Sequence, residues 1–225
     1  MTLGNLKMPV YDFYRMNSQE GKAMCGRYAI LEEEAILEMR EIINQVNEKF
    51  SERQGLVVKG EVKPSNLAPV LRAEQDKVRL DVMKWGFPRW DQSSGLIINA
   101  RSETVMEKPL FRDSFLNRRV VIPSSGFYEW DHRPDHPKDK YFFTLQGMVS
   151  YMAGFYNRFT LKDGQIAECF VILTAPAIAP VAELHDRMPV ILPRQKIRLW
   201  LDPRADATAL LQGPQPTLVS FRNGI

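Results

Sequence analysis

Apolar residues recur at helical spacing near the start of this chain and in short, strand-like runs along most of the remainder. Between residues 31 and 51 they form one face of a predicted helix, and the three glutamates at 32–34 favour its N-terminus electrostatically. With no linker between segments, the pattern predicts one domain built mainly from short strands. Further helices are predicted over 111–116, 175–183 and 193–212, and strands over 70–72, 78–83, 96–98, 120–122, 141–145, 151–156, 166–174 and 217–221.

The composition excludes several classes of protein. Of 225 residues, 44% are hydrophobic and 25% are charged, which is typical of a globular chain with a proper core. The formal net charge of +3 permits a nucleic-acid partner without arguing for one. No run is long and apolar enough to cross a membrane, and residues 1–24 lack the apolar segment of a secretory signal. Two cysteines, Cys25 and Cys169, are too few for a disulfide framework, which indicates a reducing, cytoplasmic location.

Cys25 directly follows Met24 and is the clearest candidate for chemistry. If the mature chain begins at Cys25, that residue carries an α-amine and a thiol on adjacent carbons, and both groups react near neutral pH. A 1,2-aminothiol condenses with an aldehyde to a stable five-membered thiazolidine, which an internal cysteine cannot form. The alternative is a small buried cysteine, because free cysteine usually packs in the core.

Residues 1–24 show no clear periodicity, and we expect them to lie outside a folded domain that covers 25–225. Three possibilities stay open: these residues are never translated, they are cut away after translation, or they form a disordered tail. The first of these is suggested by Gln19, Glu20 and Gly21, which can be encoded by a purine-rich ribosome-binding sequence. Only the first two possibilities give Cys25 a free amine.

Two predicted loops combine turn-forming residues with polar or aromatic side chains. The first covers 64–69 and includes Asn66 and Pro69. The second holds Trp85 and Trp90 together with basic residues, a combination that can stack unpaired bases and bind phosphates. Each signal is weak alone, because aromatic residues in loops more often pack against the core.

Glu129 and His185 are the candidates for proton transfer. Alternation over 125–130 places Glu129 on the face opposite Tyr128 and Trp130. A carboxylate among aromatic rings is costly unless it is paired or functional, and desolvation favours the protonated form that a general acid needs. The alternative is a salt bridge at the rim. His185 could shuttle protons near neutral pH, or could only hydrogen-bond its own loop.

His132 and His136 have the spacing of a metal pair on a helix, but Pro134 and the surrounding charges make this segment a solvated turn. The chain also lacks a Walker loop and a dinucleotide fingerprint. We therefore expect neither a metal nor another cofactor.

Six short segments, taken in order, resemble the SRAP family, the SOS-response-associated peptidases or abasic-site-processing proteins. Each segment is weak alone, but the ordered set is highly specific and covers residues 25 to about 200. The resemblance implies an α+β fold, a single domain with a curved, barrel-like antiparallel β core flanked by helices. The segments are Cys25-Gly26-Arg27-Tyr28, Asn66-Leu67-Ala68-Pro69, Trp85-Gly86 with Trp90, Asn99-Ala100-Arg101 with Glu103-Thr104, Phe127-Tyr128-Glu129-Trp130, and His185-Asp186-Arg187-Met188-Pro189.

The resemblance also implies a function and a set of site residues. Family members bind single-stranded DNA and crosslink to abasic sites, and their amino-terminal cysteine traps the open-chain aldehyde as a thiazolidine. In this chain Cys25 would be the nucleophile and Glu129 would shuttle protons. Asn99 would hydrogen-bond the sugar and His185 would assist ring opening. We expect a monomer in the cytoplasm, associated with the nucleoid when bound to DNA. The residues expected to contact DNA are Arg27, Asn66, Pro69, Trp85, Trp90, Arg101, Trp130 and Arg187.

The chain departs from the family pattern at both ends, and two other functions stay open. Family members begin Met-Cys, whereas here 24 residues precede Cys25, and the end of the chain is shorter than usual. One alternative is a cysteine peptidase, in which Cys25, His185 and Glu129 or Asn99 cleave a peptide bond, including the bond before Cys25. The other is a single-strand binder in which Cys25 is only a core residue. A peptidase tolerates an internal Cys25, whereas a thiazolidine former does not.

Overall fold

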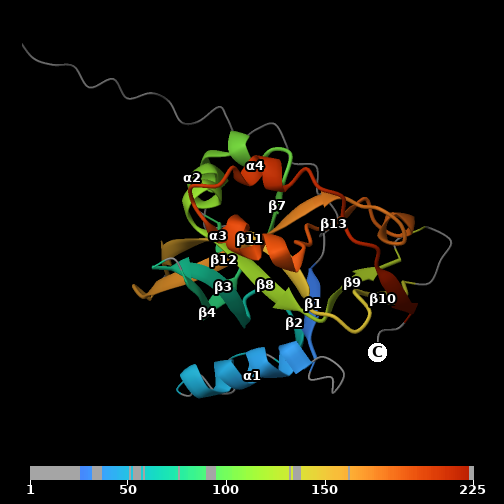
Figure 1. Ribbon diagram of the computed structural model, residues 1–225, viewed down its shortest axis with the longest axis horizontal. Coiled ribbons are helices and arrows are strands. Elements are labelled where there is room, and N and C mark those ends of the chain that lie inside the picture. The colour runs from blue at the N-terminus through green and yellow to red at the C-terminus, as the bar shows by residue number, and fades with distance from the viewer. Residues whose placement is uncertain are drawn as a thin grey trace, which may run out of the picture.

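The structure is a computed structural model of the chain (Figure 1). It describes residues 26–31, 37–50, 52, 57, 59–75, 77–89, 95–131, 133, 138–161 and 163–222. Cys25 and Trp90, two of the predicted site residues, lie outside these ranges. So do residues 1–24 and the two histidines His132 and His136.

Five strands close into a barrel, which confirms the predicted α+β fold with a barrel-like core. Adjacent strands of the ring are antiparallel except β4 and β12, which are parallel and pair Trp85 with Phe170. The ring runs from β11 (Ser150–Thr160) through β8 (Arg119–Ser124), β3 (Leu67–Glu74), β4 (Lys77–Trp85) and β12 (Ile166–Pro176) back to β11.

Strand β12 also organises two short strands near its C-terminal end. β7 (Asn99–Arg101) pairs with β12 in parallel, on the same edge as β4, and its Arg101 is opposite Thr174. β13 (Arg187–Pro189) pairs with β12 antiparallel, on the edge that β11 also uses. The chain segments that hold Asn99, Arg101 and Arg187 are therefore attached to one end of one strand.

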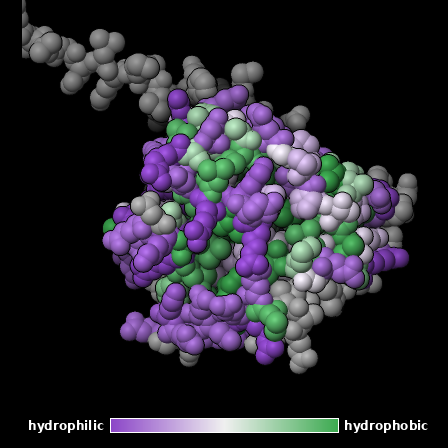
Figure 2. Space-filling view, in the orientation of Figure 1, coloured by the Kyte–Doolittle hydropathy of each residue, from purple (hydrophilic) through white to green (hydrophobic). Residues whose placement is uncertain are grey.

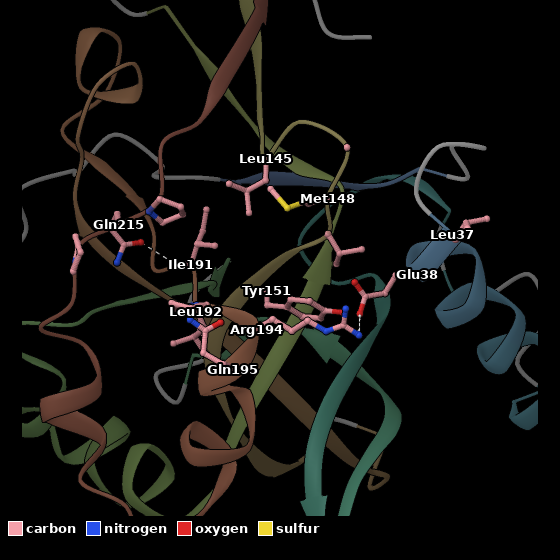
Figure 3. Close-up of a pocket in the computed structure, with 15 residues that line it drawn as sticks. Leu37, Glu38, Leu145, Met148, Tyr151, Ile191, Leu192, Arg194, Gln195 and Gln215 are labelled. Atoms are coloured by element: carbon pink, nitrogen blue, oxygen red, sulfur yellow. Dashed lines mark hydrogen bonds and ion pairs between the residues drawn. The ribbon is translucent and has the colours of Figure 1, made fainter.

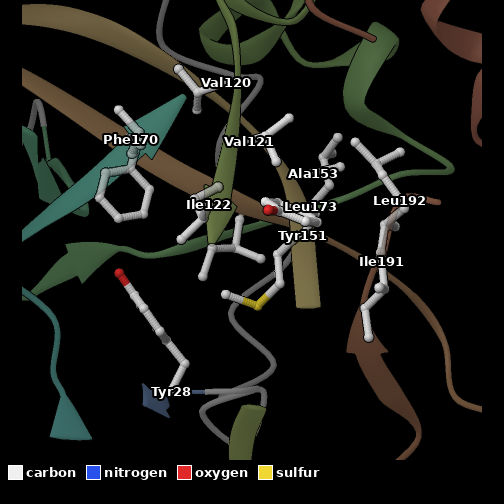
Figure 4. Packing of buried hydrophobic residues seen from close by; sticks show 14 of the residues in the cluster. Tyr28, Val120, Val121, Ile122, Tyr151, Ala153, Phe170, Leu173, Ile191 and Leu192 are labelled. Atoms are coloured by element: carbon white, nitrogen blue, oxygen red, sulfur yellow. The ribbon is translucent and has the colours of Figure 1, made fainter. Parts of the chain in front are cut away.

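The barrel is filled by tightly packed apolar side chains. Figure 4 shows side chains of β8, β11 and β12 packed together, with Tyr28 of β1 (Arg27–Ile30) pointing toward Phe170. The indole of Trp85 stacks on Phe170 and meets Tyr28 edge-on, with ring centroids 6.4 and 5.1 Å apart. Cys169 is buried in β12 as predicted, and burial raises the pKa of its thiol to about 11.

A second, five-stranded sheet lies beside the barrel (Figure 1). One of its faces turns Phe127 and Phe143 into the main core, and the other carries a smaller apolar cluster around Tyr128 and Phe142. We call this second face the outer face. The alternation confirms that Glu129 lies on the face opposite Tyr128 and Trp130. The strand order is β14 (Val219–Arg222), β10 (Lys140–Thr144), β9 (Gly126–Trp130), β1 and β2 (Gly60–Val62), all antiparallel, while β5 (Phe87–Pro88) and β6 (Leu96–Ile97) form a separate pair.

The predicted N-terminal helix is confirmed as α1 (Leu37–Lys49), whose buried residues Met39, Ile42, Ile43 and Val46 form one apolar stripe. In Figure 2 the exposed side of this helix, at the bottom of the view, is covered by hydrophilic residues. The predicted helix at 111–116 is α2 (Pro109–Asn117). No helix among the described residues is long and apolar enough to cross a membrane.

The structure differs from the prediction in the segments 64–69, 175–183 and 193–212. Strand β12 continues to Pro176, and the segment 175–183 retains only the 3-10 turn η3 (Val181–Glu183). The predicted helix at 193–212 is divided on either side of Pro203, because proline cannot continue a helix. The loop at 64–69 ends at Asn66, since β3 already begins at Leu67. The divided helix consists of η4 (Arg194–Lys196), α3 (Ile197–Leu201) and α4 (Ala207–Leu210), and η2 (Val105–Glu107) precedes α2.

Candidate functional site

Strands β1 and β9 bring the first described residue of the chain close to Glu129. Their antiparallel register pairs Arg27 with Tyr128, and one further step would set Gly26 across from Glu129. Glu129 is 1% exposed, so its carboxyl group lies within the protein and is not at a solvated rim. This excludes the rim salt bridge that the sequence left open.

The same end of β1 also approaches the segment that carries Asn99. A Cβ atom built on Gly26 would lie 4.0 Å from Cδ1 of Ile98, the residue before Asn99. Cys25 is outside the described residues, but its neighbour Gly26 is described. Gly26 therefore lies near Ile98, the residue before Asn99, and precedes the residue that pairs with Tyr128, the neighbour of Glu129.

Asn99 and Arg101 are positioned by β12 and by an indole. The carbonyl oxygen of Ile98 accepts hydrogen bonds from Trp85 Nε1, at 3.0 Å, and from the backbone N–H of Ile172, at 3.1 Å. These two bonds fix the strand just before Asn99, which is half-buried. Two residues later, Arg101 is exposed and is available to an anionic ligand.

His185 is buried, and its hydrogen bonds assign its proton. Nδ1 accepts a hydrogen bond from the backbone N–H of Arg187 at 3.1 Å. A carboxylate oxygen of Asp186 is also 3.1 Å from Nδ1, but that side chain is 81% exposed and free to turn into water, whereas the Arg187 N–H is fixed in a strand. Nδ1 is therefore the acceptor, and the neutral ring carries its proton on Nε2.

Arg187 is buried and pairs with Glu103, whose side chain is 45% exposed. Its guanidinium contacts both carboxylate oxygens of Glu103, one of them at 2.7 Å, and it donates to Thr174 O at 2.7 Å. Arg187 is 7% exposed. In this arrangement Arg187 ties β13 to the turn after β7 and holds His185 through its own backbone N–H. Sequence reasoning quoted Glu103 but assigned it no role.

Trp85 and Pro69 are buried, and Asn66 holds a turn. Trp85 is 0% exposed, and Pro69 is buried inside strand β3. Direct contact with DNA therefore does not fit these two residues, and of the two it is Trp85 that supports the segment before Asn99, through its bond to Ile98 O. Asn66 Oδ1 accepts from the N–H of Lys63 at 2.8 Å, and its carbonyl accepts from the N–H of Trp85 at 2.9 Å.

Arg27 and Trp130 lie together on the outer face of the second sheet. The guanidinium carbon of Arg27 is 5.5 Å from the centre of the Trp130 ring. Arg27 also pairs with Glu61, which in turn pairs with Lys140. Sequence reasoning missed Glu61 and Lys140, because their proximity depends on the register between strands that are distant in the chain.

A pocket elsewhere on the protein is lined by none of the predicted site residues. It has a volume of about 560 Å³ and is mostly apolar (Figure 3). Its polar features include the ion pair between Arg194 and Glu38, at 2.8 Å, and the amide oxygen of Gln215, which accepts from Ile191 N–H at 2.8 Å. Among the described residues no group of His, Cys, Asp or Glu could hold a metal ion.

Comparisons with known proteins agree on one family. The model of the family described as SOS response associated peptidase (SRAP) matches residues 24–221. The Abasic site processing protein YoqW of Bacillus subtilis (strain 168) is 35% identical over 195 residues, which are 80% of this chain and 81% of that protein. The Abasic site processing protein YedK of Escherichia coli (strain K12) is 30% identical over 142 residues, 60% of this chain and 63% of that protein.

Solved structures include similar folds. A crystal structure of a protein from Bacteroides thetaiotaomicron has a TM-score of 0.70 and 25% sequence identity, and covers 88% of this chain and 91% of that chain. A protein from Bordetella bronchiseptica, at 23% identity, has a TM-score of 0.68.

Proposed function

Because the chain belongs to the SOS response associated peptidase (SRAP) family, we propose that it processes abasic sites in DNA. In this proposal it binds single-stranded DNA and forms a covalent thiazolidine crosslink through an amino-terminal Cys25. The observation that supports this most directly is the position of Gly26. It precedes Arg27, which is paired with Tyr128 next to Glu129, and a Cβ atom built on it would lie 4.0 Å from Ile98, the residue before Asn99. A reactive group attached to Gly26 would enter a region that holds both a buried carboxyl group and a hydrogen-bonding amide.

The proposed reaction is a condensation without oxidation or reduction. The α-amine of Cys25 attacks the aldehyde carbon of the open deoxyribose, and loss of one water gives an imine. The thiol then adds to the imine carbon, its proton passes to the nitrogen, and the five-membered ring closes. The product equals protein plus DNA minus one water molecule.

The neighbouring residues would move protons and hold the sugar. Glu129 is excluded from bulk solvent and can give a proton to the departing hydroxyl and take one back. His185 presents Nε2–H, because Nδ1 is occupied by the Arg187 N–H, and would assist opening of the closed sugar. Asn99 would hydrogen-bond the sugar oxygens, and the exposed Arg101 would contact a phosphate together with Arg27.

The crosslinking form of the protein would begin at Cys25. The family match begins at Met24, so residues 1–23 lie outside it. A chain with these residues attached has an amide nitrogen at Cys25 and cannot form the imine. We therefore propose that residues 1–24 are absent from the active protein.

The test compares two forms of the chain with single-stranded DNA that contains one abasic site. One form starts at Met1, and the other starts at Cys25, with both ends established by intact mass. We expect a crosslink that survives denaturation, with a mass equal to the sum minus one water, only for the form that starts at Cys25. Cys25→Ala should abolish it, while the control Cys169→Ala retains it, since Cys169 is buried in the barrel.

Two results would overturn the proposal. Undiminished crosslinking by Cys25→Ala would exclude Cys25 as the nucleophile. A crosslinked product whose mass still includes residues 1–24, formed as readily as that of the shorter form, would exclude the free amine. The same mass spectra test the peptidase alternative, which predicts that the longer form releases residues 1–24 unaided and that Cys25→Ala prevents this.

A further inference from the structure

The outer face of the second sheet carries a compact cluster of charged and aromatic side chains. Its members are Arg27 of β1, Glu61 of β2, Tyr128 and Trp130 of β9, and Lys140 of β10. The register pairs Arg27 with Tyr128, and Lys140 with Trp130, so the cations and the rings share one face. We call these five residues the outer-face cluster. One member of the cluster, Arg27, is two residues after Cys25 in the chain.

Glu61 bridges the two cations of this cluster. One carboxylate oxygen accepts from Arg27 Nη1, and the other accepts from Lys140 Nζ. Partial burial opposes ionisation of Glu61, but the hydrogen bonds from Lys140 and Arg27 outweigh it and hold the pKa of Glu61 below its usual value. The side chains of Arg27, Glu61 and Lys140 are 36%, 25% and 30% exposed, so all three are accessible from solvent.

The aromatic rings hold the cations independently of Glu61. Lys140 Nζ lies 3.9 Å from the centre of the Tyr128 ring and 5.9 Å from that of Trp130. Arg27 lies over the other part of the cluster, 5.5 Å from the Trp130 centroid. Cation–π attraction of this kind stabilises each cation in its present place. The two positive groups therefore remain oriented when another anion replaces the carboxylate.

We propose that Arg27 and Lys140 form a phosphate subsite for the DNA strand, and that Glu61 occupies this subsite in the DNA-free protein. The inference rests on the proposed binding of single-stranded DNA, and adds Lys140 and Glu61 to it. A phosphodiester has two non-bridging oxygens, so each can replace one oxygen of the Glu61 carboxylate. Partly exposed ion pairs contribute little to stability, because water screens them, so displacing Glu61 from the two cations costs little. Glu61 thus lowers the affinity for DNA and competes with other anions.

The test measures equilibrium binding of an oligodeoxynucleotide without an abasic site, by fluorescence anisotropy over a range of salt concentrations. Lys140→Gln should weaken binding roughly two- to fivefold and reduce the slope of log K against log salt by about 0.7, the value for one contact on a single strand. Glu61→Gln should strengthen binding by a similar factor. In the Lys140→Gln background, Glu61→Gln should strengthen binding less than it does in the wild type, because Glu61 then blocks only one cation, Arg27.

Matched controls make the same charge changes at a distance from the cluster. Lys77 and Glu74 are exposed and end the β3–β4 hairpin, so Lys77→Gln and Glu74→Gln report the effect of net charge alone. Equal effects of Lys140→Gln and Lys77→Gln, or of Glu61→Gln and Glu74→Gln, would overturn the subsite. If the wild-type chain binds DNA but never crosslinks, while the cluster variants change affinity as stated, the crosslinking proposal fails and the subsite stands.

Discussion

Arg187 and Glu103, which are 84 residues apart in the chain, form an ion pair in which the guanidinium reaches both carboxylate oxygens. Arg187 is nearly buried, whereas the Glu103 side chain is 45% exposed. The same guanidinium donates to Thr174 O in β12. The pair therefore connects the turn after Asn99–Arg101 to the strand that follows His185.

We predict that Glu103→Gln destabilises the fold at neutral pH and much less in acid. The hydrogen bonds from Arg187 lower the pKa of Glu103 to about 2, against the opposing effect of partial burial. A carboxyl group whose pKa is lowered by folding stabilises the native state fully above its ordinary pKa of 4.5, and loses this contribution as the pH falls toward 2. Urea unfolding of the variant and the wild type from pH 7 to pH 2.5 measures the difference.

The expected loss at pH 7 is about 1–3 kcal/mol, because the substitution leaves a buried guanidinium without its charged partner. Glu74→Gln is the control, since Glu74 pairs with Arg79 where both side chains are largely exposed, and we expect little change. A difference between Glu103→Gln and the wild type that stays constant down to pH 2.5 would contradict the assignment.

Two substitutions of His185 distinguish the roles of its two ring nitrogens. In His185→Asn the side-chain oxygen can take the place of Nδ1 and accept from the Arg187 N–H, whereas in His185→Gln the amide reaches toward the position of Nε2. We expect His185→Asn to be the more stable of the two in thermal unfolding. Under the proposed function both should slow single-turnover crosslinking by about 100-fold, the lower end of a general acid's contribution. Equal stability of the two variants would argue against Nδ1 as the acceptor.

Periodicity in the sequence predicted elements well, but it could not predict pairing. The apolar stripe of α1 and the alternation that turns Glu129 away from Trp130 depend on residues close in the chain. Trp85 was expected in a loop, yet it ends β4. It is enclosed because β4 pairs with β12, where its partner Phe170 is 85 residues later in the chain. A pattern within one strand contains no information on such a partner.

The same limit applies to the candidate site. The resemblance pointed to Arg187 as a phosphate ligand, but its partner Glu103 became apparent only when β7 and β13 were found on the same end of β12. Lys140 carried no signal at all, because a lysine at the start of a strand is ordinary. Lys140 became a candidate only because the structure pairs it with Trp130 across β9 and β10, and because its ammonium group contacts Glu61 of β2 in the same sheet.

We predict that Arg119→Lys lowers stability by about 2–4 kcal/mol, although it preserves the charge. Arg119 is 4% exposed and donates to carbonyl groups of Phe115, Leu116 and Trp200 at 3.1, 2.8 and 2.5 Å, and to others after α3. These carbonyls end α2 and α3 and have no further helical N–H to accept from. An ammonium group cannot reach them all, so some would be buried without a donor.

The neighbouring Arg118 provides the control for Arg119→Lys. Its side chain is 28% exposed and pairs with the exposed carboxylate of Asp113. Arg118→Lys should therefore change the urea midpoint much less. Equal losses of stability in the two variants would show that the hydrogen bonds from Arg119 to the carbonyl groups do not hold the ends of α2 and α3 together.

Gly126 permits β9 and β10 to pair closely, and we predict that Gly126→Ala destabilises the fold by about 2–3 kcal/mol or more. A Cβ atom there would lie 2.4 Å from Phe143 O and 2.5 Å from Phe142 Cζ, so the strands would have to separate. Gly213→Ala is the control, because its Cβ would meet only the flexible end of Lys196 at 3.4 Å. Urea unfolding with circular dichroism measures both, and a Gly126→Ala midpoint equal to that of Gly213→Ala would contradict the prediction.

Tyr28 has a buried hydroxyl whose removal should not weaken the protein. The residue is 0% exposed, its hydroxyl has no hydrogen-bond partner among the described residues, and burial raises the pKa of the phenol. Burying an unsatisfied hydroxyl costs about 1–3 kcal/mol, whereas the ring itself packs edge-on against Trp85 and is retained in phenylalanine. We therefore expect Tyr28→Phe to raise the free energy of unfolding by about 1 kcal/mol.

Urea unfolding of Tyr28→Phe beside Tyr128→Phe makes this prediction specific. Tyr128 is on the outer face, where its ring lies under the Lys140 ammonium group, so loss of its hydroxyl removes no unsatisfied group from the barrel. Stabilisation by Tyr28→Phe alone would identify the cost of the buried hydroxyl. A loss of stability in Tyr28→Phe would instead show that this hydroxyl is hydrogen-bonded in the folded protein, because the ring and its packing against Trp85 are the same in both forms.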